Sequence, residues 1–255
     1  MGLTLDQITA SAKSLADMVN SQYVSPTEWT DYVNRGYSKV YDKMIQAYGT
    51  NYYGNTVPLL IPMVQDQEFY PMPDGTLYSG APAFYKLYGV DYNLTGDLTN
   101  PTNWYTIWPF NFGERNRGSA VPRLNNINRP VDVKYRLQAN SLWITPTPQN
   151  GMFARIWYAP SMILLVAGSD QVQNLQPGWE ELIVIYAAIE AKVKAQEDCS
   201  DLKLQFMGAL ADLKDAAVVR DVGAPFTIVD VYANGSGYCG DDGDWAGMYG
   251  GGGFW

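Results

Sequence analysis

A change of hydrophobic period within the chain constrains the fold more than any other feature of the sequence. From residue 131 to residue 137 every second residue is apolar, which is the period of two expected of a strand with one dry and one wet face. Strand-like runs follow at residues 142–145 and 152–158, with the turn dipeptide Asn150-Gly151 between them. The pattern predicts a three-stranded antiparallel meander, and the apolar period on both sides of it is helical.

The flanking sequence predicts two helical hairpins. The first joins helices over residues 4–20 and 25–48, where Ser25-Pro26-Thr27-Glu28 forms a capping box and Gly49 provides a stop. The second joins helices over residues 177–198 and 200–220 across a short break. Each helix has an apolar stripe, and each hairpin is too small to be stable alone. We therefore expect the two hairpins to pack together.

These patterns predict an α+β fold. In it, a four-helix bundle from the N- and C-terminal helical hairpins carries a central antiparallel β-rich insertion and an extended Gly/aromatic C-terminal tail. The expected divisions are residues 1–62 for the first part of the bundle, 63–170 for the β-rich insertion, 171–232 for the second part of the bundle and 233–255 for a flexible tail. The tail is too rich in glycine to pack a core of its own.

The composition excludes several classes of function. The chain has no histidine, which removes Ser-His-Asp and Cys-His catalysis and most zinc sites. Its net charge of −9 opposes binding of phosphate backbones over the whole surface, so any nucleic-acid contact needs a local basic patch. Asp242-Gly243-Asp244 is only a fragment of an EF-hand loop, because no closing Glu follows. We predict no catalytic, cofactor-binding or metal-binding residues.

The sequence carries no targeting or membrane signal. The first residues have neither a basic start nor an apolar core, so they do not form a signal peptide. The longest apolar runs are too short to span a bilayer. We expect a protein made in the cytoplasm that does not bind a membrane.

Two segments are candidate interfaces. The first is a basic loop that would face a neighbouring subunit or DNA, or would pair locally in solvent; its arginines are Arg115, Arg117, Arg123 and Arg129. The second is the tail, whose aromatic side chains are expected to anchor a partner: Tyr238, Trp245, Tyr249, Phe254 and Trp255.

Four short segments, in order, resemble landmarks of the head-to-tail adaptor (connector) proteins of tailed bacteriophages. The match spans about residues 3–230, and the segments are Trp29-Thr30-Asp31-Tyr32-Val33-Asn34-Arg35-Gly36-Tyr37, Phe84-Tyr85-Lys86-Leu87-Tyr88-Gly89-Val90-Asp91, Trp157-Tyr158-Ala159-Pro160 and Trp179-Glu180-Glu181. The tail after Asp230 lies outside the shared pattern.

The resemblance implies a structural virion protein at the junction of capsid and tail. Such proteins form a homo-oligomeric ring, commonly of twelve subunits, that docks under the portal and binds tail or nozzle proteins on its other side. The ring continues the channel, and packaged DNA passes through it without sequence-specific binding. Neither catalysis nor a cofactor is implied.

Two other functions stay open. The first is a carbohydrate-binding or host-recognition module of a virion, since the chain is rich in Tyr and Trp, which stack on sugar rings. The second is a glycoside hydrolase that uses two carboxylates. Long helices at both ends of the chain argue against a sugar-binding sandwich.

Overall fold

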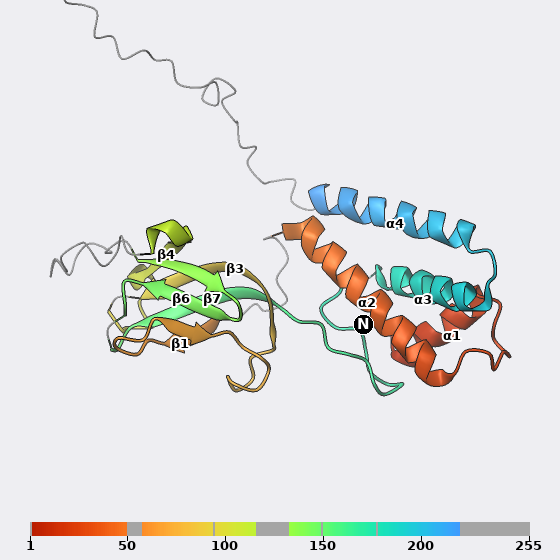
Figure 1. The fold of residues 1–255 in the computed structure, drawn as a ribbon, viewed down its shortest axis with the longest axis horizontal. Coiled ribbons are helices and arrows are strands. Elements are labelled where there is room, and N and C mark those ends of the chain that lie inside the picture. The colour runs from red at the N-terminus through yellow and green to blue at the C-terminus, as the bar shows by residue number, and fades with distance from the viewer. Residues whose placement is uncertain are drawn as a thin grey trace, which may run out of the picture. The chain divides into compact units, whose positions relative to one another are not determined.

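The chain folds into four helices and a curled β-sheet (Figure 1). The structure is a computed structural model that describes residues 2–49, 58–93, 95–115, 133–148, 150–176 and 178–219. Apart from the end of the last helix, these residues belong to one compact unit, Met1–Val218. The helices are α1 (Leu5–Leu15), α2 (Pro26–Tyr48), α3 (Glu180–Ala195) and α4 (Ser200–Val219).

The sheet has seven strands in the order β1-β7-β3-β4-β5-β6-β2. All pairs are antiparallel except β4 with β5, so the sheet is mixed. Short 3₁₀ helices η2 (Pro101–Asn103) and η3 (Phe112–Glu114) flank β4. The strands are β1 (Leu59–Pro62), β2 (Phe69–Pro71), β3 (Phe84–Asn93), β4 (Trp104–Pro109), β5 (Lys134–Gln138), β6 (Ser141–Thr145) and β7 (Phe153–Pro160).

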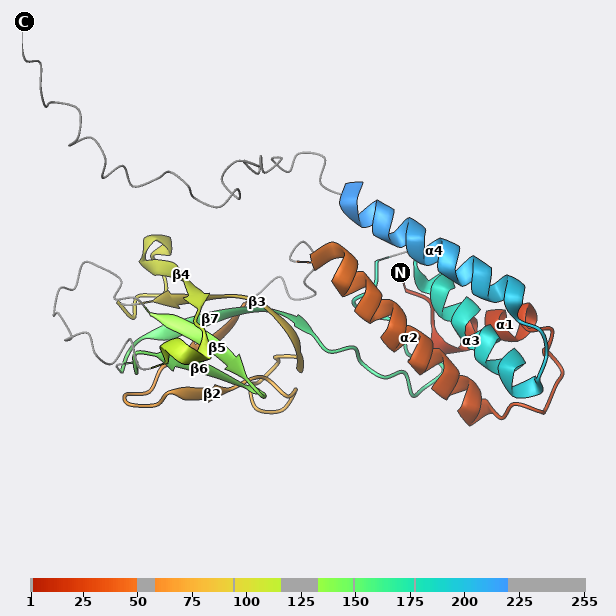
Figure 2. The same cartoon turned by 45° about the horizontal axis from the view of Figure 1, so that its top comes forward.

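The prediction of a four-helix bundle interrupted by a β-rich insertion is wrong. The sheet is an independent half of the fold with its own hydrophobic core, rather than an insertion into a bundle. Within the helical half, α1, α2 and α3 pack closely on one another, whereas α4 lies along their side and meets them through one stripe of side chains (Figure 2). Most other side chains of α4 are exposed. The fold is α+β, with four helices and a curled mixed sheet.

The predicted three-stranded meander is also wrong in its third strand. β5 and β6 do form the expected hairpin, with Ala139 at φ 50° in the turn. However, β7 leaves this hairpin and pairs with β3 over most of its length and with β1 on its other side. Local alternation shows that a segment is a strand, but it carries no information about the partner of that strand.

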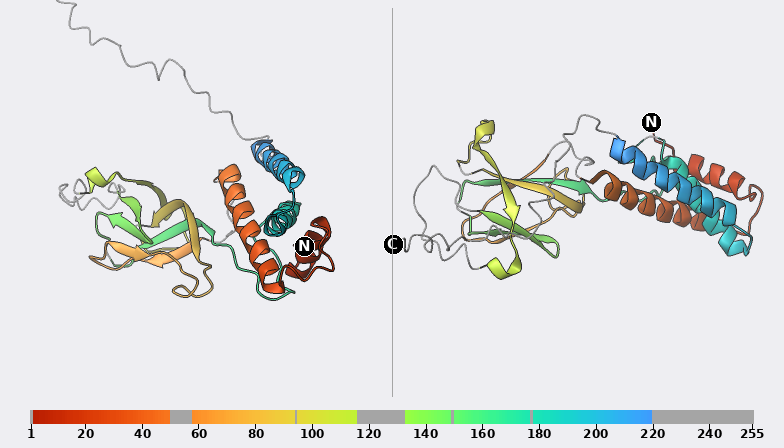
Figure 3. Two further views of the ribbon diagram at one scale, coloured as in Figure 1. Left: turned by 45° about the vertical axis from the view of Figure 1, so that its right-hand side comes forward. Right: turned by 90° about the horizontal axis from the view of Figure 1, so that it is seen from above.

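A short connection forces the sheet to curl. β1 and β2 lie on opposite edges of the sheet, yet only residues 63–68 join them. The edges of a flat seven-stranded sheet would lie about 29 Å apart, at roughly 4.8 Å per strand. An extended connection of this length reaches only about 25 Å. The sheet therefore bends into a half-barrel, and its curl can be followed in Figure 3.

Buried side chains on the inner face of the curl form the core of the sheet. The hydroxyl of Tyr70 bonds the backbone of Val64 and Gln67 and so ties the short connection to β2. The hydroxyl of Tyr158 in β7 donates a hydrogen bond to the carbonyl of Pro82, just before β3, at 2.8 Å. The core residues are Ile61, Met63, Tyr70, Met72, Val90, Tyr92, Ile107, Leu142, Ile144, Ala154, Ile156 and Tyr158.

The helix starts follow the sequence. The predicted capping box of Ser25 with Glu28 begins α2, and a second capping box, Thr4 with Gln7, begins α1. Gly49 ends α2 at φ 54°, a conformation that few other residues adopt at low cost. However, α1 ends at Leu15, five residues earlier than expected.

Buried contacts join the helices to the sheet. Tyr41 of α2 donates its hydroxyl hydrogen bond to the carbonyl of Pro160 at the end of β7. Tyr85 of β3 bonds Asp42 and packs its ring against that of Tyr41. Ala159 is wholly buried within the helical core. The ends of β3 and β7 are therefore the places where the helical half meets the sheet.

Gly36 sets the distance between α2 and α3. A Cβ at this position would lie 3.0 Å from Cδ1 of Tyr186 and 3.3 Å from the carbonyl oxygen of Ile183. These atoms belong to the buried face of α3 and have little freedom to move. A residue without a side chain is therefore needed here for close packing.

We predict that Gly36→Ala lowers the free energy of unfolding by about 1 kcal/mol. Overpacking costs about 1–3 kcal/mol and outweighs a gain in helix propensity of about 1 kcal/mol. Gly208→Ala in α4 is the matched control, since nothing lies within 4 Å of its added Cβ. That control should gain about 0.5–1 kcal/mol. Urea denaturation of dilute protein measures both; stabilisation by both variants would contradict the close approach.

An ion pair joins α2 to the last turn of α3. Nζ of Lys194 donates to both carboxylate oxygens of Glu28, at 2.6 and 2.8 Å. These hydrogen bonds, together with those from Ser25, lower the pKa of Glu28 to about 2 from an ordinary 4.5, and the pKa of Lys194 is raised by the same partner. Since the carboxyl pKa is depressed, its contribution to stability is present above pH 4.5 and is lost as the pH falls towards 2.

Glu28→Gln should therefore flatten the acid limb of the stability curve. Between pH 5 and pH 2 the melting temperature of the parent protein should fall more steeply than that of the variant, because only the parent loses the ion pair. Glu181→Gln, at an exposed position of α3, serves as the control and should keep the parent slope. Parallel curves for all three proteins would show that the pair does not contribute to stability.

Candidate interaction surface

The outer face of the curled sheet gathers aromatic and charged side chains. Residues that alternate with the buried core positions point outwards, as the strand period requires. On β3 and β7 these include Asp91 and Arg155, and on β4 they include Trp104, Thr106 and Trp108. This face therefore combines aromatic, hydroxyl and charged side chains and is the candidate interaction surface.

A half-buried ion pair lies at the centre of three strands. Arg155 of β7 donates through Nε and Nη2 to Oδ2 of Asp91, at 2.9 and 2.8 Å. Trp157 donates to the same oxygen at 2.8 Å, and the hydroxyl of Thr106 donates to Oδ1 at 2.9 Å. The carboxylate therefore ties β3 to both of its neighbours. The guanidinium of Arg155 also stacks on the ring of Trp104 at 4.4 Å.

The environment keeps Asp91 ionised. Burial by itself would raise the pKa of its carboxyl, but hydrogen bonds from Trp157, Arg155 and Thr106, with the positive charge of Arg155, outweigh burial and lower the pKa. Every donor around the carboxylate is supplied by the protein. This cluster is accordingly a structural tie, and its proton is not available for acid catalysis near neutral pH.

Asp91→Asn should lower the free energy of unfolding by about 2–3 kcal/mol, because it leaves the half-buried Arg155 without its counter-charge. Arg155→Met should be similarly costly. The double variant should lose no more than the worse single variant, because the two side chains contribute mainly through each other. Denaturation of all four proteins gives the coupling energy, and additive losses would contradict this account.

A second outer cluster, the aromatic–basic patch, surrounds Phe112. It consists of Trp108, Phe112, Arg115, Arg136 and Trp143. The guanidinium groups of Arg115 and Arg136 stack on the ring of Phe112 at 4.5 and 5.3 Å. The ring of Trp143 meets Phe112 edge-on at 6.3 Å. Trp108 is 71% exposed and Phe112 48% exposed. The patch presents flat apolar rings beside fixed positive charges, which suits contact with an acidic partner.

The structure places one of the predicted site residues in this patch. Arg115 follows η3 and donates to the carbonyl of Phe112 at 3.1 Å, so part of the predicted basic loop is held against the sheet. The rest of the predicted loop and the tail anchors lie outside the described residues: Arg117, Arg123, Arg129, Tyr238, Trp245, Tyr249, Phe254 and Trp255. Their assignments stay predictions.

Sequence reasoning missed the other four members of the patch, of which Arg136 and Trp108 show why. Arg136 belongs to the polar, outward half of the predicted alternation in β5, and that alternation was the signal that could have found it. Trp108 lies two residues before Phe110, which is buried, and only the sheet register reveals that Trp108 faces outwards beside Lys134.

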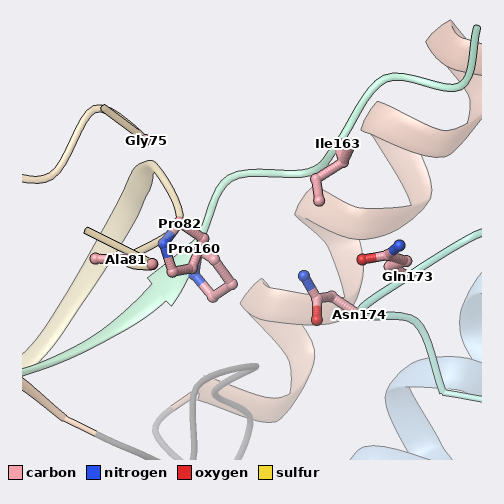
Figure 4. A pocket seen from close by; sticks show the side chains of 8 residues that line it. Gly75, Ala81, Pro82, Pro160, Ile163, Gln173 and Asn174 are labelled. Atoms are coloured by element: carbon pink, nitrogen blue, oxygen red, sulfur yellow. The ribbon is translucent and has the colours of Figure 1, made fainter. Parts of the chain in front are cut away.

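The described residues also line two hollows on the surface. One, of about 450 Å³, has Pro82 and Pro160 on one side and Gln173 and Asn174 on the other (Figure 4). Its lining has two amide side chains and no ionisable group. The other, of about 780 Å³, lies along α1 and the start of α3 and includes Glu180 and Glu181.

Glu180 has a local role. Its Oε2 accepts a hydrogen bond from the backbone N–H of Gly178 at 2.7 Å, next to the start of α3, where negative charge is favoured. The acidic pair is therefore explained as helix N-terminal charge. The first hollow has no ionisable group, and in the second one member of the carboxylate pair already accepts a backbone hydrogen bond, so neither hollow points to nucleophilic or acid–base chemistry.

The described part of the chain has neither a metal-binding cluster nor a helix that could span a membrane. Within it, no group of three or more acidic or cysteine side chains is arranged to hold a metal ion. None of its helices combines the length and the apolar character needed to cross a bilayer.

The sequence matches no protein-family model and no curated protein.

Proposed function

We propose that the protein is a structural virion protein, a head-to-tail adaptor whose copies form a ring between the portal and the tail of a bacteriophage and continue the DNA channel. In this role it needs no cofactor and catalyses no reaction. Its partners are further copies of itself, the portal and a tail or nozzle protein. The virion, at the junction of capsid and tail, is then its location.

The observation that carries the proposal is where the four adaptor-like segments lie. The segment of residues 29–37 provides five of the ten buried residues of α2, and Gly36 within it packs against α3, which begins inside the segment of residues 179–181. The segment of residues 84–91 is β3, and it pairs with the segment of residues 157–160 at the end of β7. The adaptor-like segments thus lie in the frame of the fold, as expected if the resemblance reflects a similar architecture.

The aromatic–basic patch supports the same role. Interfaces between proteins are enriched in aromatic side chains and arginine, and both are concentrated here on a surface that faces solvent. A ring protein needs such surfaces on several sides, for its neighbours and for the components above and below it.

The exposed ring of Trp108 also favours one alternative. A flat tryptophan on a sheet face stacks well on a sugar ring, as in a carbohydrate-binding or host-recognition module of a virion. Under that alternative, Trp108→Ala should abolish glycan binding while the particle mass stays that of a monomer. Because the described residues provide no pair of free carboxylates in a hollow, no observation favours the glycoside hydrolase.

The decisive experiment is the mass of the particle, alone and with its portal. We expect a ring many times heavier than the 28.4 kDa chain, formed either freely or on the portal as template. Native mass spectrometry and electron microscopy measure it. A chain that lacks residues 250–255 should keep the melting temperature of the full chain and bind the portal more weakly.

The control for this experiment is a portal from an unrelated phage, which should bind neither chain. A protein that stays monomeric with and without its portal, and that binds a glycan on an array, would contradict the adaptor and favour the carbohydrate module.

A further inference from the structure

We infer that the aromatic–basic patch of one subunit binds the outward face of α4 on a second copy of the chain. The inference rests on the proposed function, since it names the two surfaces through which neighbouring subunits would meet. Each surface is described below, and the two are complementary in both apolar character and charge.

The outward face of α4 is apolar where solvent would favour polar residues. Leu204 is 68% exposed and Met207 is 67% exposed. At about 100° per residue, they lie with Gly208 and Ala211 on the side of the helix opposite Leu202 and Leu213, which are buried. The helix therefore has two apolar stripes, of which only one is packed on its own subunit.

Charges are divided between the two flanks of this outward stripe. By the same helical geometry, Asp201 and Asp212 lie on one flank, Lys203 and Lys214 lie on the other, and the exposed Asp215 lies within the stripe itself, close to Leu204. Residues 180–219 as a whole contain eight acidic and four basic side chains, so this part of the surface is negative. The acidic flank and the apolar stripe together form a surface that a basic, aromatic partner fits.

The aromatic–basic patch has the opposite character. Its charged members, Arg115 and Arg136, are both basic, and they are fixed by stacking on Phe112, so little side-chain entropy remains to be lost on binding. Trp108 and Phe112 supply exposed apolar area beside them.

Both surfaces belong to the same chain, and both face solvent within the described structure. Trp108 and Leu204 are each more than two-thirds exposed, so neither surface is satisfied within its own subunit. Because the two surfaces differ, each subunit would offer one to the neighbour before it and the other to the neighbour after it. Contacts of this heterologous kind generate closed rings or open filaments, whereas a two-fold contact ends in a dimer.

A charge-swap experiment tests the pairing directly. Variant one carries Arg115→Glu and Arg136→Glu, and variant two carries Asp201→Lys and Asp212→Lys. Each should associate at least about 10-fold more weakly than the parent chain, which corresponds to about 1.4 kcal/mol. An equimolar mixture should regain association, because the reversed patch of one variant then meets the reversed α4 of the other.

Matched controls separate the surfaces from net charge. Lys43→Glu with Lys86→Glu makes the same change in charge as variant one, at exposed positions away from the patch, and should leave association near the parent value. Analytical ultracentrifugation at low and high salt measures all proteins, and the parent should dissociate as salt rises. Circular dichroism melting identifies any variant that fails to fold, in which case Arg115→Gln with Arg136→Gln replaces variant one.

The outcomes distinguish this inference from the proposed function. Rings that form equally well with both variants would overturn the pairing of these surfaces and leave the adaptor proposal intact. A mixture that fails to regain association, although each variant is folded and defective, would also overturn it. A parent chain that is monomeric at all concentrations but binds an oligonucleotide through Arg115 and Arg136 would show that the patch serves nucleic acid instead.

Discussion

The pairing of β3 with β7 is the interaction on which the rest of the structure depends. It joins residues 84–93 to residues 153–160 and places both strands in the middle of one half of the sheet. The ion pair between Asp91 and Arg155 lies across it, and Tyr158 packs against Phe84 within it. At the end of the pairing, the carbonyl of Pro160 accepts a hydrogen bond from the hydroxyl of Tyr41 in α2. One strand pair therefore organises the sheet and connects it to the helices.

The order of the other strands explains how an acidic protein carries a local basic patch. β4 pairs with β3 on one side and with β5 on the other, and these two pairings bring Trp108 beside Lys134. The hairpin of β5 and β6 then sets Arg136 opposite Trp143. Residues about 30 apart in the chain thus share one face of the sheet. Their charges act together only because the strand order places them side by side.

Much of the local structure was predictable from the sequence, for physical reasons. Side-chain caps act within one turn of a helix, so Thr4 and Ser25 mark the starts of α1 and α2 reliably. The turn between β5 and β6 is equally local. The partners of β7 and the curl of the sheet were not predictable, because they depend on contacts between residues far apart in the chain.

The misjudged role of α4 shows a second limit of sequence patterns. Its stripe of Leu202, Phe206 and Leu213 has the right spacing for a core helix, and these residues do pack on the helical core. A periodic stripe identifies an apolar face of a helix. Leu204 and Met207 form a second such face on α4, and periodicity does not show which of the two faces packs within the subunit.

The same limit applies to the candidate site: residues close together in the chain were predictable from the sequence, and residues brought together by the sheet were not. Arg115 stands out in the sequence because it belongs to a cluster of arginines. Arg136 lies 21 residues further along the chain, and Trp108 is placed on the same face only by the strand register, so the sequence does not connect either of them with Arg115. Stacking on Phe112 brings the two guanidinium groups together on one ring, which concentrates charge and holds it in place. An interface of this kind gains its affinity from fixed groups, since flexible arginines would lose more entropy on binding. The register of the curled sheet therefore determines which charged side chains the patch presents to solvent.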